Sequence, residues 1–231
     1  MHIEPTKYSA VVFDLDGTLL NTLQDIADSV NVTLSLLGFP QHEVGAFRYF
    51  VGDGEEKLAW RALPENRRDP AIVKRVLAGF QEQYATRWAN NTHPYAGVPE
   101  LLDALSRDGL RMAILTNKGQ VFAEATVSRL LPRWHFDVVL GAHPAIPAKP
   151  DPAGARQIAR QLGISPALFL YLGDSGVDMK TAVAAGMCPV GALWGYRESR
   201  ELLAAGARVL LRQPMDLIPL LRAPSTPSAL P

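Results

Sequence analysis

The sequence predicts an α/β protein: a parallel sheet with helices on both faces, plus an inserted all-helical cap. Three observations predict it. A short apolar run near the N-terminus ends in acidic residues, a long stretch with only helical periodicity follows, and strand and helix patterns alternate over the rest of the chain. Such alternation is typical of parallel sheets whose strands are connected by helices.

The first strand is expected at residues 9–13, SAVVF, where apolar and β-branched residues precede Asp14 and Gly17. A buried run of this length that opens into a glycine-containing loop is typical of the end of a strand. The next pattern is helical, covers about residues 22–37 and ends at Gly38.

Every periodic segment between residues 21 and 93 favours a helix. The expected helices lie at residues 44–50, 55–63 and 70–88, and the last begins with Pro70, where a missing N–H costs nothing. Since no strand pattern interrupts them, we expect residues 21–93 to form the helical cap.

After residue 94 the patterns predict the remainder of a Rossmann-like α/β core, composed of residues 1–20 and 94–222. Pro and Ser are frequent in residues 223–231, which we expect to be a disordered tail. The expected strands are 112–115, 136–140, 168–172, one near Val190, and 208–211; the expected helices are 98–107, 120–131, 152–162, 177–185 and 199–205.

The composition limits the classes of function. The chain has 231 residues, of which 48% are hydrophobic, and its 23 basic side chains balance 23 acidic ones. This balance favours neither a nucleic-acid nor a membrane partner. Cys188 is the one cysteine, so an internal disulfide is excluded, and the N-terminus has no apolar signal-peptide pattern. We therefore expect a cytoplasmic protein.

The pentapeptide Asp14-Leu15-Asp16-Gly17-Thr18 is the first candidate site. Carboxylates at i and i+2 leave a strand on the same side, and Gly17 permits a sharp turn. One carboxylate can then attack while the other handles protons. The alternative is a loop that merely begins with Asp, but a buried strand ending in two acids favours a functional site.

Thr116-Asn117 follows the predicted strand at 112–115. A hydroxyl there can bind a phosphoryl oxygen, whereas Thr-Asn is also common in turns, and the turn is the favoured interpretation. Lys118 is a further cation nearby, for which a solvated side chain is the default expectation.

Lys149 precedes Pro150, which restricts it to an extended conformation, and Pro152 can open the next helix. A rigid backbone would hold the ammonium in place, although a plain surface lysine is an equally good interpretation of this segment alone.

Gly173-Asp174-Ser175-Gly176-Val177-Asp178 follows the predicted strand at 168–172. Asp178 lies four residues after Asp174, so it can face the same sheet edge from the first turn of a helix. Carboxylate oxygens suit Mg²⁺. The alternative is that Asp174 or Ser175 simply caps the helix.

These four segments, in this order and with a helical insert after the first, resemble the haloacid dehalogenase-like hydrolase superfamily over almost the whole chain, to about residue 221. Within it, Val51-Gly52-Asp53-Gly54, Leu58 and Arg61-Ala62-Leu63 look like the cap of phosphoglycolate phosphatases. The stretch 141–146, GAHPAI, lacks the acidic residues associated with this loop in those enzymes. This departure concerns the substrate and leaves the catalytic segments unchanged.

The resemblance implies a Mg²⁺-dependent phosphatase. Asp14 would attack phosphorus and form an aspartyl-phosphate, and Asp16 would protonate the leaving group and then activate water. Thr116 and Lys149 would bind the phosphoryl oxygens. The metal ligands would be the Asp14 side chain, the Asp16 backbone carbonyl and Asp174, with Asp178 acting in support.

The expected substrate is a small phosphorylated metabolite, with 2-phosphoglycolate as the leading choice. Asn117, Gly52, Gly54 and Arg61 are expected to help bind it, and Arg48 and Lys57 are further candidate cations in the cap. A phosphosugar mutase and a pyrophosphatase or nucleotidase of the same superfamily stay open, as does a non-catalytic binding module. We expect a monomer or homodimer.

Overall fold

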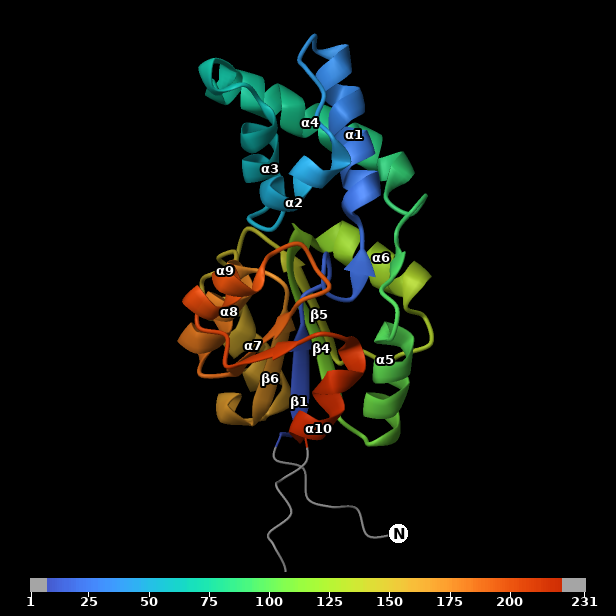
Figure 1. Ribbon diagram of the computed structural model, residues 1–231, viewed down its shortest axis with the longest axis vertical. Helices are drawn as coiled ribbons and strands as arrows, with labels where there is room; N and C mark the ends of the chain where they lie inside the picture. Colours follow the sequence, from blue (N-terminus) through green and yellow to red (C-terminus); the bar gives the residue numbers. More distant parts are fainter. Residues whose placement is uncertain (1–7, 222–231) are drawn as a thin grey trace, which may run out of the picture.

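The computed structural model describes residues 8–221. Over these residues the chain forms a parallel sheet with helices on both faces, and a block of helices lies beyond one end of the sheet (Figure 1). The predicted fold class is confirmed. The expected tail at 223–231 lies outside the described residues.

Within residues 8–221, one sheet has six strands, and every neighbouring pair in it is parallel. The strand order is β5-β4-β1-β6-β7-β8, so the chain extends the sheet first on one side of β1 and then on the other. The carboxyl end of β1 therefore lies where the strand order reverses, and open α/β sheets form their sites there. The strands are β1 (Ala10–Phe13), β4 (Arg111–Gly119), β5 (Val138–Ala142), β6 (Phe169–Gly173), β7 (Cys188–Ala192) and β8 (Val209–Leu211).

Side chains of β1 alternate between two hydrophobic clusters, one on each face of the sheet. Val11 and Phe13 belong to the first cluster, and Ala10 and Val12 belong to the second. All four are fully buried, which explains why this strand is a continuous apolar run. The first face is covered by α5 (Val98–Arg107), α6 (Gln120–Leu130) and α10 (Ile218–Leu221), the second by α7 (Ala153–Leu162) and α8 (Gly176–Ala185), and α9 (Ser199–Ala204) packs against α8.

Strand β4 is longer than the sequence predicts. It continues to Gly119, and its pairing with β5 changes register between Leu115 and Gly119. Thr116 and Asn117 consequently lie within the extended strand, and the interpretation of these two residues as a turn is wrong.

The helical block has a hydrophobic core of its own. It includes Leu34, Phe47, Phe80 and Tyr84, and also Tyr196, which comes from the loop after β7. Asp69 begins the longest of these helices by accepting a hydrogen bond from the backbone of the second helical residue. The helices are α1 (Leu23–Leu36), α2 (Phe47–Phe50), α3 (Glu55–Ala62) and α4 (Pro70–Arg87), with short 3₁₀ turns at 44–46 and 65–67.

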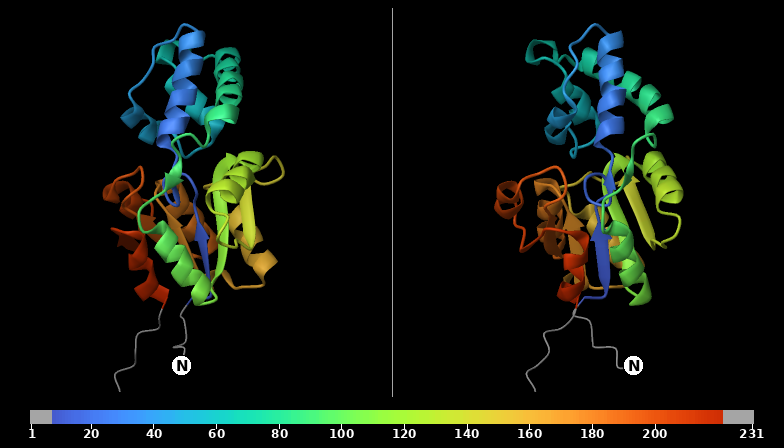
Figure 2. Two further views of the ribbon diagram at one scale, coloured as in Figure 1. Left: turned by 90° about the vertical axis from the view of Figure 1, so that its right-hand side faces the viewer. Right: turned by 45° about the vertical axis from the view of Figure 1, so that its right-hand side comes forward.

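Two very short strands connect the block to the sheet. β2 (Leu20–Asn21) pairs antiparallel with β3 (His93–Pro94), so the outgoing and returning segments lie side by side (Figure 2). This pair has no signal in the sequence, because two residues are too few to display an alternating pattern. The pair lies at the expected limits of the cap, whose definition as a domain at 21–93 stays a prediction. Over residues 8–221, every helix is too short or too polar to cross a membrane.

Phe169 tests the core of the sheet, because its ring is fully buried at the start of β6. We expect Phe169→Ala to lower the free energy of unfolding by about 3–5 kcal/mol, since truncation leaves a cavity. Urea denaturation followed by circular dichroism measures this loss. The matched control is Leu203→Ala on α9, where the side chain is 55% exposed and a change within about 0.5 kcal/mol is expected. Equal losses in the two variants would contradict the assignment of the core.

Candidate active site

Four segments that are distant in sequence meet at the carboxyl edge of the sheet. They are the ends of β1, β4 and β6, and the loop that carries Lys149 before α7. Parallel strands bring their carboxyl ends to one edge, which is why residues that follow different strands become neighbours. The site is therefore built by the sheet, and the helical block faces it from above (Figure 1).

Lys149 lies at the centre of this group. Its Nζ lies 2.8 Å from Asp14 Oδ1 and 2.7 Å from Asp178 Oδ1, and it donates a hydrogen bond of 3.1 Å to the Leu115 carbonyl. Its side chain is 3% exposed, so the interpretation as a surface lysine is wrong. The positive charge of Lys149 compensates carboxylates that water barely reaches.

Asp14, Asp174 and Asp178 form a compact acidic cluster. Each offers one carboxylate oxygen, and these oxygens lie within 4.8 Å of one another. All three residues are buried. Oxygen donors at this spacing fit a hard divalent cation such as Mg²⁺.

Asp174 is held from two sides. Thr18 Oγ1 donates to its Oδ1 at 3.0 Å, and the backbone N–H of Tyr196 donates to its Oδ2 at 2.7 Å. Gly17 passes so close that a Cβ there would lie 2.4 Å from Asp174 Oδ2. Its φ of +86° is also one that other residues rarely adopt. The glycine after Asp16 therefore serves both the turn and the approach of Asp174.

Asp178 has two partners besides the cluster. Ser175 begins α8 and its Oγ donates to Asp178 Oδ2 at 2.6 Å, while the Ser175 backbone N–H donates to the same oxygen at 3.1 Å. The helix-capping interpretation of Ser175 is thus confirmed, and it coexists with the ion pair between Asp178 and Lys149. Capping fixes the carboxylate that holds the ammonium.

Burial makes this cluster costly when its acids are ionised. It raises the pKa of Asp14 to about 7, with the charge of Asp178 adding to the effect and Lys149 opposing it. Burial likewise raises the pKa of Asp174 to about 8, and the charges of Asp14 and Asp178 add to it. A cation bound among these carboxylates would relieve this cost.

The Asp16 carboxylate points to a different partner. Lys118 Nζ donates to its two oxygens at 3.0 and 3.1 Å. Asp16 is therefore absent from the acidic cluster of side chains within residues 8–221, and only its backbone carbonyl is left for the metal role that the resemblance implies. Its carboxylate is therefore separate from the acidic cluster and pairs with Lys118.

The burial of Lys118 is another difference from the expectation based on sequence. It was expected to be solvated, yet the side chain is 4% exposed. The signal was present, because Thr116 and Lys118 are two positions apart in an extended segment and so face the same side. The short strand predicted at 112–115 ended too early to reveal it.

Asn117 joins the sheet to the helical block. Its Nδ2 donates to the carbonyls of Gly52, at 2.9 Å, and Lys149, at 3.1 Å, and its Oδ1 accepts from the Lys149 backbone N–H at 2.9 Å. These bonds occupy the amide that was expected to bind substrate. Asn117 thus holds the Lys149 backbone and the loop at 51–54, and its expected role in substrate binding stays a prediction.

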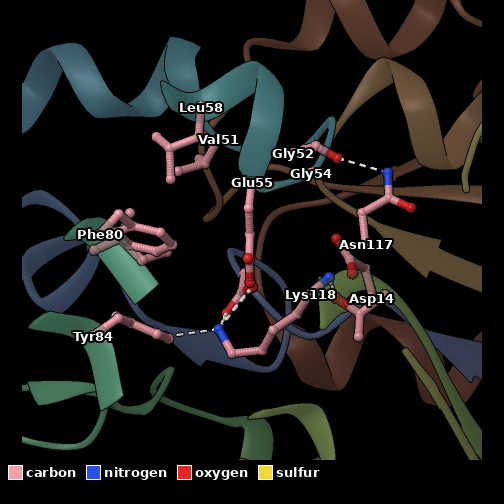
Figure 3. Close-up of a pocket in the computed structure, with 13 residues that line it drawn as sticks. Asp14, Val51, Gly52, Gly54, Glu55, Leu58, Phe80, Tyr84, Asn117 and Lys118 are labelled. Atoms are coloured by element: carbon pink, nitrogen blue, oxygen red, sulfur yellow. Dashed lines mark hydrogen bonds and ion pairs between the residues drawn. The ribbon is translucent and has the colours of Figure 1, made fainter. Parts of the chain in front are cut away.

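A cavity of about 60 Å³ separates the acids from the helical block (Figure 3). Gly52, Gly54 and Thr116 line it as expected. Among the described residues that line the cavity, Arg61 is absent. Its guanidinium pairs with the Asp53 carboxylate, and the residue borders another groove. The lining residues are Asp14, Asp16, Ile26, Val51, Gly52, Gly54, Glu55, Leu58, Phe80, Tyr84, Thr116, Asn117 and Lys118.

Arg197, in the loop after β7, was not identified from the sequence. Its guanidinium donates to the carbonyls of Arg48 and Val51 and pairs with Glu201. It also borders a second small hollow next to Asp174. No motif in this loop marks Arg197, because the two partners that join it to the block are backbone carbonyls of a remote segment.

Gly17→Ala tests the close approach at Asp174. The added Cβ requires Asp174 to move, so we expect at least a tenfold loss of affinity for a divalent cation, measured by calorimetry. Gly38→Ala is the matched control, because Gly38 has a similar φ of +75° but no atom within 4 Å of the added Cβ. Both variants carry the same backbone strain, and only the first should lose affinity. A similar loss in both would contradict the role of Gly17.

Known proteins resemble this chain over most of its length. A family model described as haloacid dehalogenase-like hydrolase matches residues 11–192. The phosphoglycolate phosphatase of Thiobacillus denitrificans is 34% identical over 202 residues, covering 86% of this chain and 88% of that relative. The phosphoglycolate phosphatase of Pseudomonas putida KT2440 is 33% identical over 220 residues, covering 94% and 80%.

Solved structures agree. A crystal structure from Lactobacillus delbrueckii subsp. bulgaricus has a TM-score of 0.88 and 28% identity, covering 93% of this chain and 98% of that one. A protein described as a predicted phosphoglycolate phosphatase from Haemophilus somnus 129pt has a TM-score of 0.86 and 27% identity, with the same two coverages, 93% and 98%. From the family match and these relatives, we conclude that the chain belongs to the haloacid dehalogenase-like hydrolase family.

Proposed function

We propose that this protein is a Mg²⁺-dependent phosphatase that hydrolyses a small phosphate monoester through an aspartyl-phosphate on Asp14. The observation that carries the proposal is the group at the sheet edge: Lys149 pairs with Asp14 and Asp178, and Asp174 completes an acidic cluster beside a cavity. The reaction class itself follows from the family and its relatives: the chain is a phosphoric monoester hydrolase.

The charges of the site support the need for a cation. A phosphate dianion next to a carboxylate is repelled by about 4 kcal/mol per unit-charge pair at about 4 Å and an effective dielectric constant of about 20. Lys149 supplies one positive charge, which is too little for the acidic cluster and the substrate together. Asp14, Asp174 and the Asp16 carbonyl would hold Mg²⁺, with Asp178 in support, and the ion would neutralise charge on the phosphoryl group.

Asp14 is suited to the attack because its orientation is fixed. The Leu15 backbone N–H donates to Asp14 Oδ1 at 2.7 Å, and Lys149 lies 2.8 Å from the same oxygen. Attack on phosphorus would form a bond from the carboxylate to phosphorus as the bond to the leaving oxygen breaks. Lys149 and the Thr116 hydroxyl, which lines the cavity, would stabilise the charge on the phosphoryl oxygens.

Asp16 would perform the acid–base chemistry. It would give a proton to the leaving oxygen, and its carboxylate would then take a proton from the water that hydrolyses the aspartyl-phosphate. Its separation from the acidic cluster and its pairing with Lys118 support a role distinct from that of Asp14.

The proposed substrate is 2-phosphoglycolate. The names of the relatives and the small volume of the cavity support it. Lys118 is the cation in the described lining, and its charge would attract the substrate carboxylate while its three donors stay on Asp16 and Tyr84. The expected cap cations Arg48, Lys57 and Arg61 lie outside that lining. A cytoplasmic location and a monomeric or homodimeric state stay predictions.

Magnesium should stabilise the protein in a pH-dependent manner. The pKa values of Asp14 and Asp174 are raised to about 7 and about 8 in the metal-free fold, from an ordinary 3.8. The folded state thus retains protons that the unfolded state has lost, so metal-free stability falls as pH rises from about 4 to about 8. Mg²⁺ competes with those protons, and its stabilising effect should be larger at pH 8 than at pH 5.5.

Thermal denaturation with and without saturating Mg²⁺ measures this effect. At about 100 times the dissociation constant we expect about 2.7 kcal/mol of stabilisation at pH 8, or roughly 5–10 °C in Tm. Asp174→Asn should remove most of the rise. An equal rise at the two pH values would contradict the proposed ligands.

A screen of small phosphorylated metabolites, 2-phosphoglycolate among them, tests the function. Asp14→Asn should reduce phosphate release to background, because the amide cannot form the aspartyl-phosphate. Asp16→Ala should lower kcat by about 10²–10⁴-fold while circular dichroism shows an intact fold. Near-normal turnover in either variant contradicts the assigned role, and activity confined to other esters rejects 2-phosphoglycolate alone.

A further inference from the structure

Tyr84 of the helical block contacts Lys118, the lysine that pairs with Asp16 at the edge of the sheet. It lies on α4, its side chain is 2% exposed, and its hydroxyl accepts a hydrogen bond of 2.7 Å from Lys118 Nζ (Figure 3). The same ammonium lies 4.9 Å from the centroid of the Tyr84 ring. The contact therefore joins a helix of the block to β4.

Lys118 has no donor to spare once this bond is made. An ammonium has three N–H donors, and those of Lys118 reach Asp16 Oδ1, Asp16 Oδ2 and the Tyr84 hydroxyl. A lysine side chain is long and flexible, so two bonds to one carboxylate leave it free to swing about that group. The third bond, to Tyr84, fixes the ammonium and with it the plane of the Asp16 carboxylate.

The Tyr84 ring is itself held firmly. Phe80 stacks on it at 5.2 Å between centroids, and Phe122 of α6 meets it edge-on, also at 5.2 Å. The hydroxyl is thus presented by a ring fixed between α4 and α6. This hydroxyl can therefore hold the Lys118 ammonium of β4 in one position.

We propose that Tyr84 is a positioning residue for the acid–base step: through Lys118 it sets the orientation of Asp16, and it does so only while α4 rests on the carboxyl edge of the sheet. This inference rests on the proposed role of Asp16. Tyr84 touches neither the phosphoryl group nor its leaving oxygen in this scheme, and its effect passes through Lys118.

Comparing substrates with good and poor leaving groups tests whether Tyr84 positions Asp16. Proton transfer from Asp16 matters when the leaving oxygen is a poor leaving group and matters little when it departs readily as an anion. A displaced Asp16 should therefore slow the cleavage of phenyl phosphate much more than that of 4-nitrophenyl phosphate. A variant that merely loosened the fold would slow both esters alike.

The experiment measures single-turnover formation of the aspartyl-phosphate from these two aryl esters, with Mg²⁺ present. Tyr84→Phe should lower the rate about tenfold for phenyl phosphate and less than about threefold for 4-nitrophenyl phosphate, as expected for a displaced catalytic group. Tyr49→Phe is the matched control, because it removes a hydroxyl from a tyrosine of the block that is 58% exposed. It should leave both rates unchanged.

Lys118→Met provides the second variant. It should reproduce the selective loss, and Tyr84→Phe in that background should add nothing further, because both residues act through one contact. Equal losses for the two esters in Tyr84→Phe, or additive losses in the double variant, overturn the proposal.

Asp16→Ala distinguishes failure of the proposed acid role of Asp16 from failure of the positioning role of Tyr84. If it shows the selective loss and Tyr84→Phe does not, only the positioning role of Tyr84 is rejected. If Asp16→Ala shows no difference between the esters, the acid role of Asp16 is rejected, and the role of Tyr84 is rejected with it.

Discussion

The buried ammonium of Lys149 is the interaction on which this site depends. It lies within 2.8 Å of carboxylate oxygens of Asp14 and Asp178, in a place that water barely reaches. Buried acids at this spacing repel one another, and the raised pKa values of Asp14 and Asp174 express that cost. Much of the surrounding structure serves to hold this ammonium, including the Asn117 amide and the capped start of α8.

The helical block and the sheet are joined by residues that also contact, or lie beside, the charged groups of the site. Asn117 binds the Gly52 carbonyl and the Lys149 backbone, Arg197 binds the Val51 carbonyl beside Asp174, and Tyr84 binds the lysine that pairs with Asp16. Residues of the block therefore form part of the surroundings of the proposed catalytic groups. The cavity at the sheet edge and the contact of Tyr84 with Lys118 are formed by the same packing.

Local patterns predicted the architecture well, and they failed where partners are remote. The apolar run of β1 and the alternation after residue 94 are properties of contiguous residues, so the parallel sheet could be expected. The short pair β2–β3, the continuation of β4 to Gly119 and the burial of Lys118 depend on neighbours far along the chain. Arg61 was expected to face the substrate, but Asp53 lies nearer and pairs with it.

The sequence by itself determined which groups stand at the ends of the strands. Hydrophobic periodicity locates the strands, and the residues that come next are fixed by the covalent chain. It thereby identified Asp14, Asp16 and Asp174 as candidates, while the flanking proline marked Lys149 and the spacing from Asp174 marked Asp178. Only the tertiary structure decided their pairing: Lys149 with Asp14 and Asp178, and Lys118 with Asp16 and Tyr84. The reason is physical, since the partner of a buried charge is set by distance and desolvation in three dimensions, and these quantities have no local signature in the chain.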